Sequence, residues 1–468
     1  MSPSTQPRIE RDSLGERELP ADVYYGIQTA RAIENFPISG FKPYPSFVTA
    51  TVQIKKAAAR VNSALGVLDT RIAQAIEDAA GEVLAGKLRD QFVVDPFQAG
   101  AGTSHNMNAN EVLANRAIEL LGGEKGDYSI VHPNDHVNMA QSTNDVVPTA
   151  MRLAALELVN GLINTLDLLQ GSLRAKSIEF DRIVKSGRTH LQDAVPIRLG
   201  QEFGGYATAI HKNANRISLA ADELKEIGLG GTAVGTGLNA PPGYRKRVVE
   251  ELSRITNQPL RATEDYFEAM QSMSPFVGLS GALRTLATDV IRIANDLRLL
   301  SSGPNTGLVE INLPAVQPGS SIMPGKVNPV IAEMTDMVCF QVMGNDLVIA
   351  TAAQAGQLEL NVMMPAIAFN LLMSLTILNS GLTVLRTRCV EGVSANDERC
   401  RWYVEHSISL VTALSPRIGY ARAAEIAKRA IASGKTIRET IEEEGLLTPE
   451  ELVEVMDTRA MTEYKDEQ

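Results

Sequence analysis

Residues 279–300 read LSGALRTLATDVIRIANDLRLL, and the spacing of their apolar side chains predicts one long helix. The apolar positions alternate steps of four and three residues: Leu279, Leu283, Leu286, Val290, Ile293, Leu297 and Leu300. Such an alternation forms the seam between helices that pack at a shallow angle, as in helix bundles. At a rise of about 1.5 Å per residue, the segment is roughly 30 Å long. The chain is therefore expected to contain a bundle of long helices.

The same alternation recurs in three other parts of the chain. It runs from Ala155 to Leu173, from Phe203 to Leu224 and from Leu371 to Leu385. The segment from Met363 to Leu385 carries almost no charge on any face, and a helix that is apolar all round is either in a membrane or wholly buried. Several sibling helices are present to cover it, so burial is favoured, and full burial would require other subunits. We therefore expect a homo-oligomer built on a multi-helix core.

Length, charge and cysteine content narrow the class of protein. A chain of 468 residues exceeds what one hydrophobic core usually supports, so two or three domains are expected, with boundaries near residues 143 and 397. The net charge of -11 argues against nucleic-acid binding, which needs a basic surface. The three cysteines are an odd number without metal-like spacing, so neither disulfides nor a zinc site is expected.

The distribution of apolar residues along the chain indicates in which cellular compartment the protein is expected. The N-terminal residues contain no apolar segment typical of a secretion signal. No run approaches the roughly 18 uncharged apolar residues of a membrane span. The sequence therefore predicts a reduced, cytoplasmic protein without a membrane partner.

One predicted loop carries several side chains suited to catalysis and substrate binding. Its sequence is Gly319-Ser320-Ser321-Ile322-Met323-Pro324-Gly325-Lys326-Val327-Asn328-Pro329. Four prolines in and before it rule out a continuous helix. The loop brings together two hydroxyls, an ammonium group and a carboxamide. Ser320 or Ser321 is a potential base, and Lys326 and Asn328 can bind a carboxylate.

Three further segments carry polar groups that are unusual for a helical core. Residues 100–108 (GAGTSHNMN) precede a helix expected from Asn110, and a helix N-terminus preceded by small and polar residues suits an anion. Residues 136–145 (HVNMAQSTND) and 187–193 (GRTHLQD) add hydroxyls, amides and His190. Taken singly, each segment could be a simple helix cap or, at His190, a structural histidine.

Together the four segments resemble the fumarase/aspartase superfamily of lyases, whose signature reads G-S-x-x-M-x-x-K-x-N. The other three segments are similar to active-site regions of that superfamily and occur in its order, and the resemblance covers most of the chain. It implies an all-α fold of three domains, here 1–142, 143–397 and 398–468, with a central long-helix bundle completed by tetramerisation. It also implies active sites shared between subunits. Neither a cofactor nor a metal in the site is expected, and whether a divalent metal activates the protein is left open. The glycine-rich residues 228–237 lack the βαβ setting of a dinucleotide site and are expected to form a turn beside the active site.

The resemblance also implies roles for individual residues. Ser320 is expected to be the catalytic base, with Lys326 and Asn328 on the α-carboxylate of the substrate. His190 is expected near the leaving group, as a proton carrier or an orienting donor. The residues expected to hold the β-carboxylate are Thr103, Ser142, Thr143 and Ser321. The residues expected around the leaving amino group are Asn144, Thr189 and His190.

Within the superfamily, the open question is whether ammonia or water leaves. Tyr24-Tyr25-Gly26, Glu310-Ile311-Asn312-Leu313-Pro314 and residues 142–145 (STND) resemble the aspartase branch, which converts L-aspartate to fumarate and ammonia. Met363-Met364-Pro365 departs from that branch, because an acidic residue often precedes the proline there. Fumarase, acting on malate and fumarate, remains an alternative. A further alternative is a structural relative without catalytic activity, although the presence of all the polar site residues named above argues against it.

Overall fold

The computed structural model describes residues 7–463, and the chain divides into two compact units. Unit 1 comprises Met1–Ile163, Asn215–Ala287 and Phe340–Asn379. Unit 2 comprises Asn164–Ala214, Thr288–Cys339 and Ser380–Gln468. This division differs from the three expected domains, which stay a prediction.

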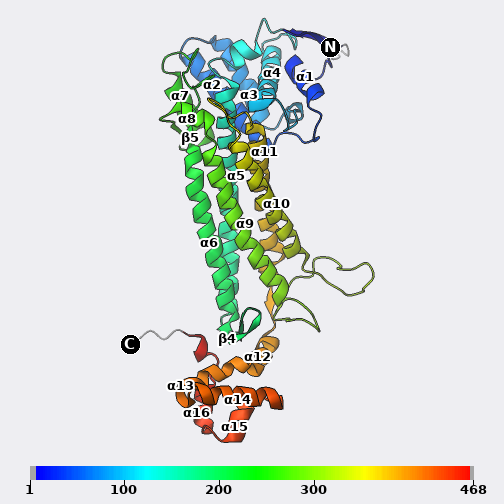
Figure 1. Ribbon diagram of the computed structural model, residues 1–468. Coiled ribbons are helices and arrows are strands. Elements are labelled where there is room, and N and C mark those ends of the chain that lie inside the picture. Colours follow the sequence, from blue (N-terminus) through cyan, green and yellow to red (C-terminus); the bar gives the residue numbers. More distant parts are fainter. Residues whose placement is uncertain (1–6, 464–468) are drawn as a thin grey trace. The chain divides into compact units, whose positions relative to one another are not determined.

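The fold is predominantly α-helical, as predicted, and Figure 1 shows the succession of its helices. The helices are α1 (Ile27–Asn35), α2 (Pro45–Ala64), α3 (Thr70–Leu84), α4 (Thr103–Leu120), α5 (Thr143–Glu179), α6 (Leu199–Asp222), α7 (Tyr244–Thr256), α8 (Tyr266–Gln271), α9 (Ser274–Leu300), α10 (Val330–Ala353), α11 (Met364–Arg388), α12 (Asp397–His406), α13 (Ser415–Ile418), α14 (Tyr420–Ser433), α15 (Ile437–Glu444) and α16 (Pro449–Val455). The strands are β1 (Arg8–Asp12), β2 (Gly15–Leu19), β3 (Val184–Thr189), β4 (Gln192–Arg198), β5 (Glu226–Ile227), β6 (Arg261–Ala262), β7 (Ile311–Asn312) and β8 (Ser394–Ala395). Within residues 7–463 they pair as four two-stranded sheets.

The four stretches with alternating apolar spacing lie in long helices, which confirms that prediction, except that Leu224 falls in the 3₁₀ turn Glu223–Lys225 after α6. They fall in α5, α6, α9 and α11, and the seam residues of α9 from Leu279 to Leu297 are at most 2% exposed. By length and composition alone, α5 and the segment Met364–Gly392 could cross a membrane, which the sequence analysis did not expect. The apolar windows of these helices are 72% and 56% buried within the chain, as in core helices of other proteins.

The core of unit 1 lies among α2, α3 and α4. It consists of small and branched side chains, including Val52, Ile76 and Val112, all fully buried. The entry to α3 is fixed by Asp69, whose carboxylate accepts the backbone N–H groups of Arg71 and Ile72 at 2.8 and 3.1 Å. This packing holds the N-terminal end of α4 in place.

Unit 2 contains the β3–β4 hairpin and the helices α12 to α16. A separate apolar core, which includes Leu410, Ile426 and Ile441, joins α14, α15 and α16. Thr448-Pro449-Glu450-Glu451 is a typical helix start, and in the structure Thr448 caps α16 while Glu451 closes a capping box. Helix α14 ends at Ser433, and Gly434 follows it in the left-handed conformation that is typical of a helix C-cap.

Candidate functional site

The first polar segment forms the opening turns of α4 in unit 1. The helix begins at Thr103 and not at Asn110, so the expected start is wrong by seven residues. Gly102 precedes it at φ 86°, a left-handed conformation that glycine adopts without strain, and the polar residues after it continue the helix because their side chains find partners. Thr103 is exposed at the first position of α4, where free N–H groups favour an anion.

The second polar segment begins α5 in the same unit. Ser142, Thr143 and Asn144 are all part-exposed. The N–H of Asn144 donates to Ser142 Oγ at 3.2 Å, and Asn144 Nδ2 donates to the carbonyl of Ala233 at 2.8 Å. The amide of Asn144 is thereby tied to the glycine-rich turn that the sequence analysis placed beside the site.

Asp145 fastens this turn to the start of α5. Its carboxylate is fully buried and accepts the backbone N–H groups of Ser142, Gly230 and Thr232, each at 2.9 Å. Burial raises the pKa of Asp145 to about 6, against the lowering effect of these three donors. No role was expected for Asp145 from the sequence, although an acid directly after three polar residues at a helix start was an available signal.

A chain of amides connects the starts of α4 and α5. Asn106 Nδ2 donates to Thr143 Oγ1 at 3.3 Å and to Asn138 Oδ1 at 3.2 Å. Asn138 Oδ1 also accepts from Lys55 Nζ at 2.8 Å, and Lys55 donates to Gln141 Oε1 at 3.0 Å. Lys55 has no exposed surface, although it lies on α2 among alanines and valines. A lysine on the apolar stripe of a helix was the signal that the sequence analysis missed.

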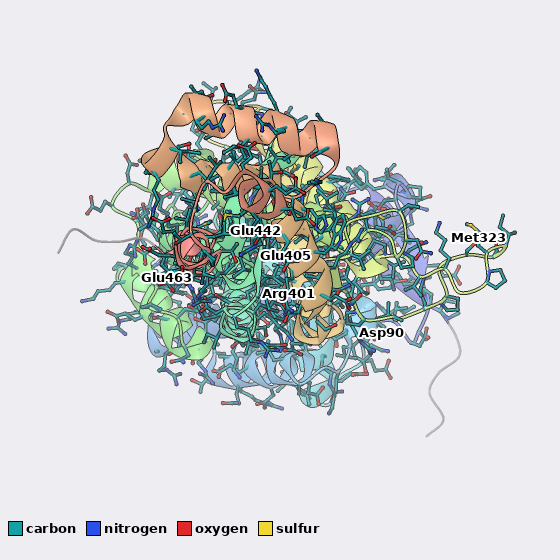
Figure 2. All side chains as sticks on the ribbon, turned by 90° about the horizontal axis from the view of Figure 1, so that it is seen from below. Asp90, Met323, Arg401, Glu405, Glu442 and Glu463 are labelled. Carbon is teal, nitrogen blue, oxygen red and sulfur yellow. The ribbon has the colours of Figure 1, made fainter. Side chains whose placement is uncertain are left out.

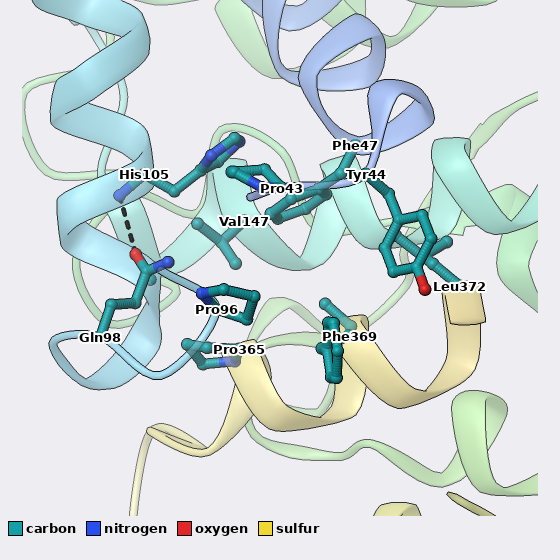
Figure 3. A pocket seen from close by; sticks show the side chains of 12 residues that line it. Pro43, Tyr44, Phe47, Pro96, Gln98, His105, Val147, Pro365, Phe369 and Leu372 are labelled. Atoms are coloured by element: carbon teal, nitrogen blue, oxygen red, sulfur yellow. Dashed lines mark hydrogen bonds between the residues drawn. The ribbon is translucent and has the colours of Figure 1, made fainter. Parts of the chain in front are cut away.

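A small apolar pocket lies beside the start of α4, also in unit 1. Figure 3 shows it among Phe47, Pro96, His105 and Phe369, with the N–H of His105 bonded to Gln98 Oε1 at 2.8 Å. The cavity measures about 30 Å³, which suits one or two water molecules and no substrate. This pocket is therefore part of the packing behind the site.

In unit 2, Thr189 and His190 lie at the tip of the β3–β4 hairpin. Thr189 pairs with Gln192, so His190 and Leu191 form a two-residue turn, with φ of 56° and 59°. Both central residues of such a turn must be left-handed, a conformation that normally selects Asn or Gly. Thr189 and His190 are exposed, and Leu191 is 71% exposed. The hairpin presents both polar side chains to solvent.

Buried charges anchor the base of this hairpin. Lys185 Nζ donates to both carboxylate oxygens of Glu202 at 2.9 Å and lies 2.8 Å from Glu310 Oε2. Arg188 Nη1 donates to Glu310 Oε1 at 2.8 Å, and Glu310 has no exposed surface. Burial raises the pKa of Glu202, whereas Lys185 lowers it. The cluster links β3 to the segment that leads into the Gly319 loop, and the sequence analysis assigned it no role.

The Gly319 loop also belongs to unit 2 and contains no helix, as predicted. Ser320 Oγ accepts the backbone N–H groups of Ile322 at 3.2 Å and Met323 at 3.0 Å. Asn328 Nδ2 donates to the carbonyl of Gly319 at 2.7 Å, which closes the base of the loop. Figure 2 shows Met323 at the outer end of the loop, away from Arg401 and Glu405 on α12.

The exposure of the loop residues is uneven. Ser321 and Lys326 are exposed, whereas Ser320 and Asn328 are part-buried. Two backbone N–H groups directed at one hydroxyl oxygen stabilise negative charge on that oxygen. The arrangement can therefore support ionisation of Ser320.

The expected site residues thus fall into two groups. Unit 1 holds Thr103, Ser142, Thr143 and Asn144, and unit 2 holds Thr189, His190, Ser320, Ser321, Lys326 and Asn328. Hydrogen bonds link the starts of α4 and α5 through Asn106, but within residues 7–463 none joins Thr189 or His190 to the Gly319 loop. The same residues contain no group of three His, Cys, Asp or Glu side chains placed to hold a metal ion.

Comparison with known proteins identifies relatives over the whole length of the chain. Residues 15–344 match a family model described as Lyase, and residues 410–463 match one described as Fumarase C C-terminus. An aspartate ammonia-lyase from a Bacillus species is 50% identical over 459 residues, covering 98% of both chains. A class II fumarate hydratase from Thermosynechococcus vestitus is 50% identical over 449 residues, covering 96% of both.

A solved structure is similar over the same extent. A crystal structure described as fumarate lyase:delta crystallin from Brucella melitensis bound to cobalt has a TM-score of 0.96 and 52% sequence identity. The match covers 98% of this chain and 100% of that chain.

Proposed function

This chain belongs to the lyase family, and we propose that it is an aspartate ammonia-lyase that reversibly converts L-aspartate to fumarate and ammonia. Relatives with that activity in their names match nearly its full length. The observation that carries the mechanism is the pair of backbone N–H groups directed at Ser320 Oγ.

The chemical demand of the reaction explains why these N–H groups matter. The enzyme must remove a proton from the carbon next to the β-carboxylate, a weak acid whose anion is an enediolate with two negative charges. Within the Gly319 loop, no Asp, Glu or His is available, which leaves a serine as the base. Ser320 is favoured over Ser321 because its Oγ accepts the two N–H groups, and Lys326 adds a positive charge to the same loop.

The remaining residues are assigned to the substrate by chemical type. Lys326 and Asn328 hold the α-carboxylate, the lysine through a charge-assisted hydrogen bond. Asn144, Thr189 and His190 surround the amino group that leaves, with His190 as its proton carrier or orienting donor. The donors to the β-carboxylate are Thr103, Ser142, Thr143 and Ser321. These donors stabilise the enediolate, usually the largest contribution to such catalysis.

Ser320→Ala tests the base. Fumarate formation is followed by absorbance near 240 nm, and kcat should fall by orders of magnitude while succinate still binds within a few-fold, because the lost interaction is needed only in the transition state. Ser321→Ala is the matched control: it removes one of four proposed donors to the β-carboxylate, so it should weaken binding and should lower kcat far less than Ser320→Ala does. A Ser320→Ala enzyme with a tenth of the wild-type kcat would exclude Ser320 as the base and direct attention to Ser321 or His190.

The active form is proposed to be a homotetramer with shared sites. In unit 1, one stripe of α10 exposes Phe340, Met343 and Leu347 at three- and four-residue spacing, with exposed fractions of 59%, 40% and 69%. An apolar stripe of this size usually lies in an interface. Mixing inactive Thr189→Ala and Ser320→Ala subunits by joint refolding should restore part of the activity. No recovery after verified mixed assembly would exclude shared sites.

A second candidate function is class II fumarase, favoured by the 50% identity to a fumarate hydratase. Running the absorbance assay in parallel with L-aspartate and L-malate separates the two activities. Turnover of neither substrate would favour a silent structural relative. A cytoplasmic location is part of the same proposal, and fractionation of cells that produce the protein tests it.

A further inference from the structure

We propose that Lys55 is a positioning residue for this reaction: it sets the direction of the hydrogen bonds that end at Thr143, so that the Thr143 hydroxyl donates to the β-carboxylate of the substrate. The substrate in this inference rests on the proposed function. The direction of the hydrogen bonds follows from the chain alone.

In its ammonium form, Lys55 has three hydrogens to donate and no lone pair with which to accept. Lys55 Nζ can only donate, so the side-chain atoms that face it on Asn138 and Gln141 must both be oxygens. Amide oxygen and nitrogen are told apart by their partners, and here a donor-only partner decides. The amide nitrogen of Asn138 then points to the carbonyl of Gln141, at 3.2 Å.

The oxygen of Asn138, once its position is fixed by Lys55, determines which way the side-chain amide of Asn106 is oriented. Asn138 Oδ1 accepts from Asn106 Nδ2 and also from Asn110 Nδ2, both at 3.2 Å. The second hydrogen of Asn106 Nδ2 is directed to Thr143 Oγ1 at 3.3 Å. A threonine hydroxyl that accepts one hydrogen bond still has its own hydrogen to donate. That hydrogen is the donor available to a carboxylate beside the start of α5.

The unpartnered atoms of the network support this direction. Asn106 Oδ1 and Asn110 Oδ1 are buried without a hydrogen-bond partner among the described residues. Turning either amide round would set its oxygen against Asn138 Oδ1 and would leave its N–H group without a partner instead, so the observed direction is the favourable one. Asn138 Oδ1 requires both N–H groups, because Lys55 holds that oxygen in place.

The positive charge of Lys55 also favours binding of a carboxylate near Thr143. Its Nζ forms no ion pair within residues 7–463, and the nearby Asp145 is committed to three backbone N–H groups. Burial lowers the pKa of Lys55 to about 7, with Asp145 opposing the shift, so the ammonium form that fixes these directions predominates below that pH. A buried ammonium without a carboxylate partner favours the binding of an anionic group nearby.

Lys55→Met, alone and combined with Thr143→Val, tests the inference. The probe is succinate, which carries both carboxylates and whose Kd is measured by calorimetry without any turnover. Lys55→Met should weaken succinate binding by about 10- to 100-fold in the Thr143 background, the range for a hydrogen bond to a charged group. In the Thr143→Val background the same change should weaken binding by less than about 3-fold, because the hydroxyl that it orients is gone.

Equal effects in both backgrounds would overturn the inference, since a purely structural role predicts additivity. Lys56→Met, on the same helix and part-exposed, is the matched control and should leave the Kd unchanged. If Lys55→Met does not fold, as judged by circular dichroism and gel filtration, Asn106→Leu replaces it in the cycle with the same expectation. Failure of the proposed function would appear separately, as absent turnover of L-aspartate by the wild-type protein with succinate binding intact.

Discussion

Replacing Lys185 by Met should strongly destabilise the hairpin that carries Thr189 and His190. The side chain contributes one of two positive charges in a buried cluster that also holds Glu202 and Glu310, and all three of its contacts are at 2.8–2.9 Å. Lys185→Met changes the local sum of charges from zero to minus one. The two carboxylates are left with Arg188 alone, which reaches only Glu310.

The size of the effect follows from the burial of these groups. Breaking a buried pair by removing one partner costs about 3–5 kcal/mol, because the other charge stays buried without compensation. Lys185 and Glu310 are at most 1% exposed, which places this pair in that class, whereas the Glu202 side chain is 23% exposed. Lys212→Met removes an exposed charge from α6 and should change the free energy of unfolding by less than about 0.5 kcal/mol.

The loss should also depend on pH. The pKa of Glu202 is raised in the folded protein by burial, and Lys185 restrains that rise. Without the lysine the pKa rises further, so the folded state of the variant takes up a proton more readily than the unfolded state. The deficit should therefore be larger at pH 8 than at pH 5, where Glu202 can be neutral.

Two measurements check this prediction at a fixed protein concentration. One is the urea midpoint of unfolding at pH 5 and pH 8, and the other is amide hydrogen exchange in residues 184–198. A loss below about 1 kcal/mol, or one that is the same at both pH values, would refute the reasoning from uncompensated charge.

Three further predictions concern single side chains. Lys326→Ala should lower kcat/KM by about 100-fold or more, because it removes the charge-assisted contact proposed for the α-carboxylate, and near-normal kcat/KM would refute that placement. Leu191→Asn should raise the free energy of unfolding by about 1 kcal/mol, since an L-residue without a local hydrogen bond is strained at φ 59°; a lower urea midpoint would contradict it. Thr448→Ala should cost about 1 kcal/mol by removing the cap of α16, and unchanged amide exchange in residues 449–455 would exclude the effect.

The helical fold was predictable because its signals are local and periodic. The alternation of four and three in α5, α6, α9 and α11 depends only on which residues share a helix face, and the caps at Thr448 and Gly434 depend on neighbours within a few positions. The Gly319 loop was predictable for the same reason, since its prolines exclude a helix. The start of α4 was not, because Asn106 finds its partners 32 and 37 residues away, and those bonds let polar residues 103–108 continue the helix.

The sequence by itself determined the helices, the loop and the residue types suited to binding a dicarboxylate. Only the tertiary structure decided which polar groups support them. The sequence alone does not show the partners of Lys55, and its buried contacts arise only because α2 packs against residues 138–141. Lys185 and Glu310 are 125 positions apart in the chain, yet their charged atoms lie 2.8 Å from each other. Burial and hydrogen-bond direction arise between segments distant in the chain, so no local pattern encodes them, and the buried charges behind the site became visible only after folding placed their partners.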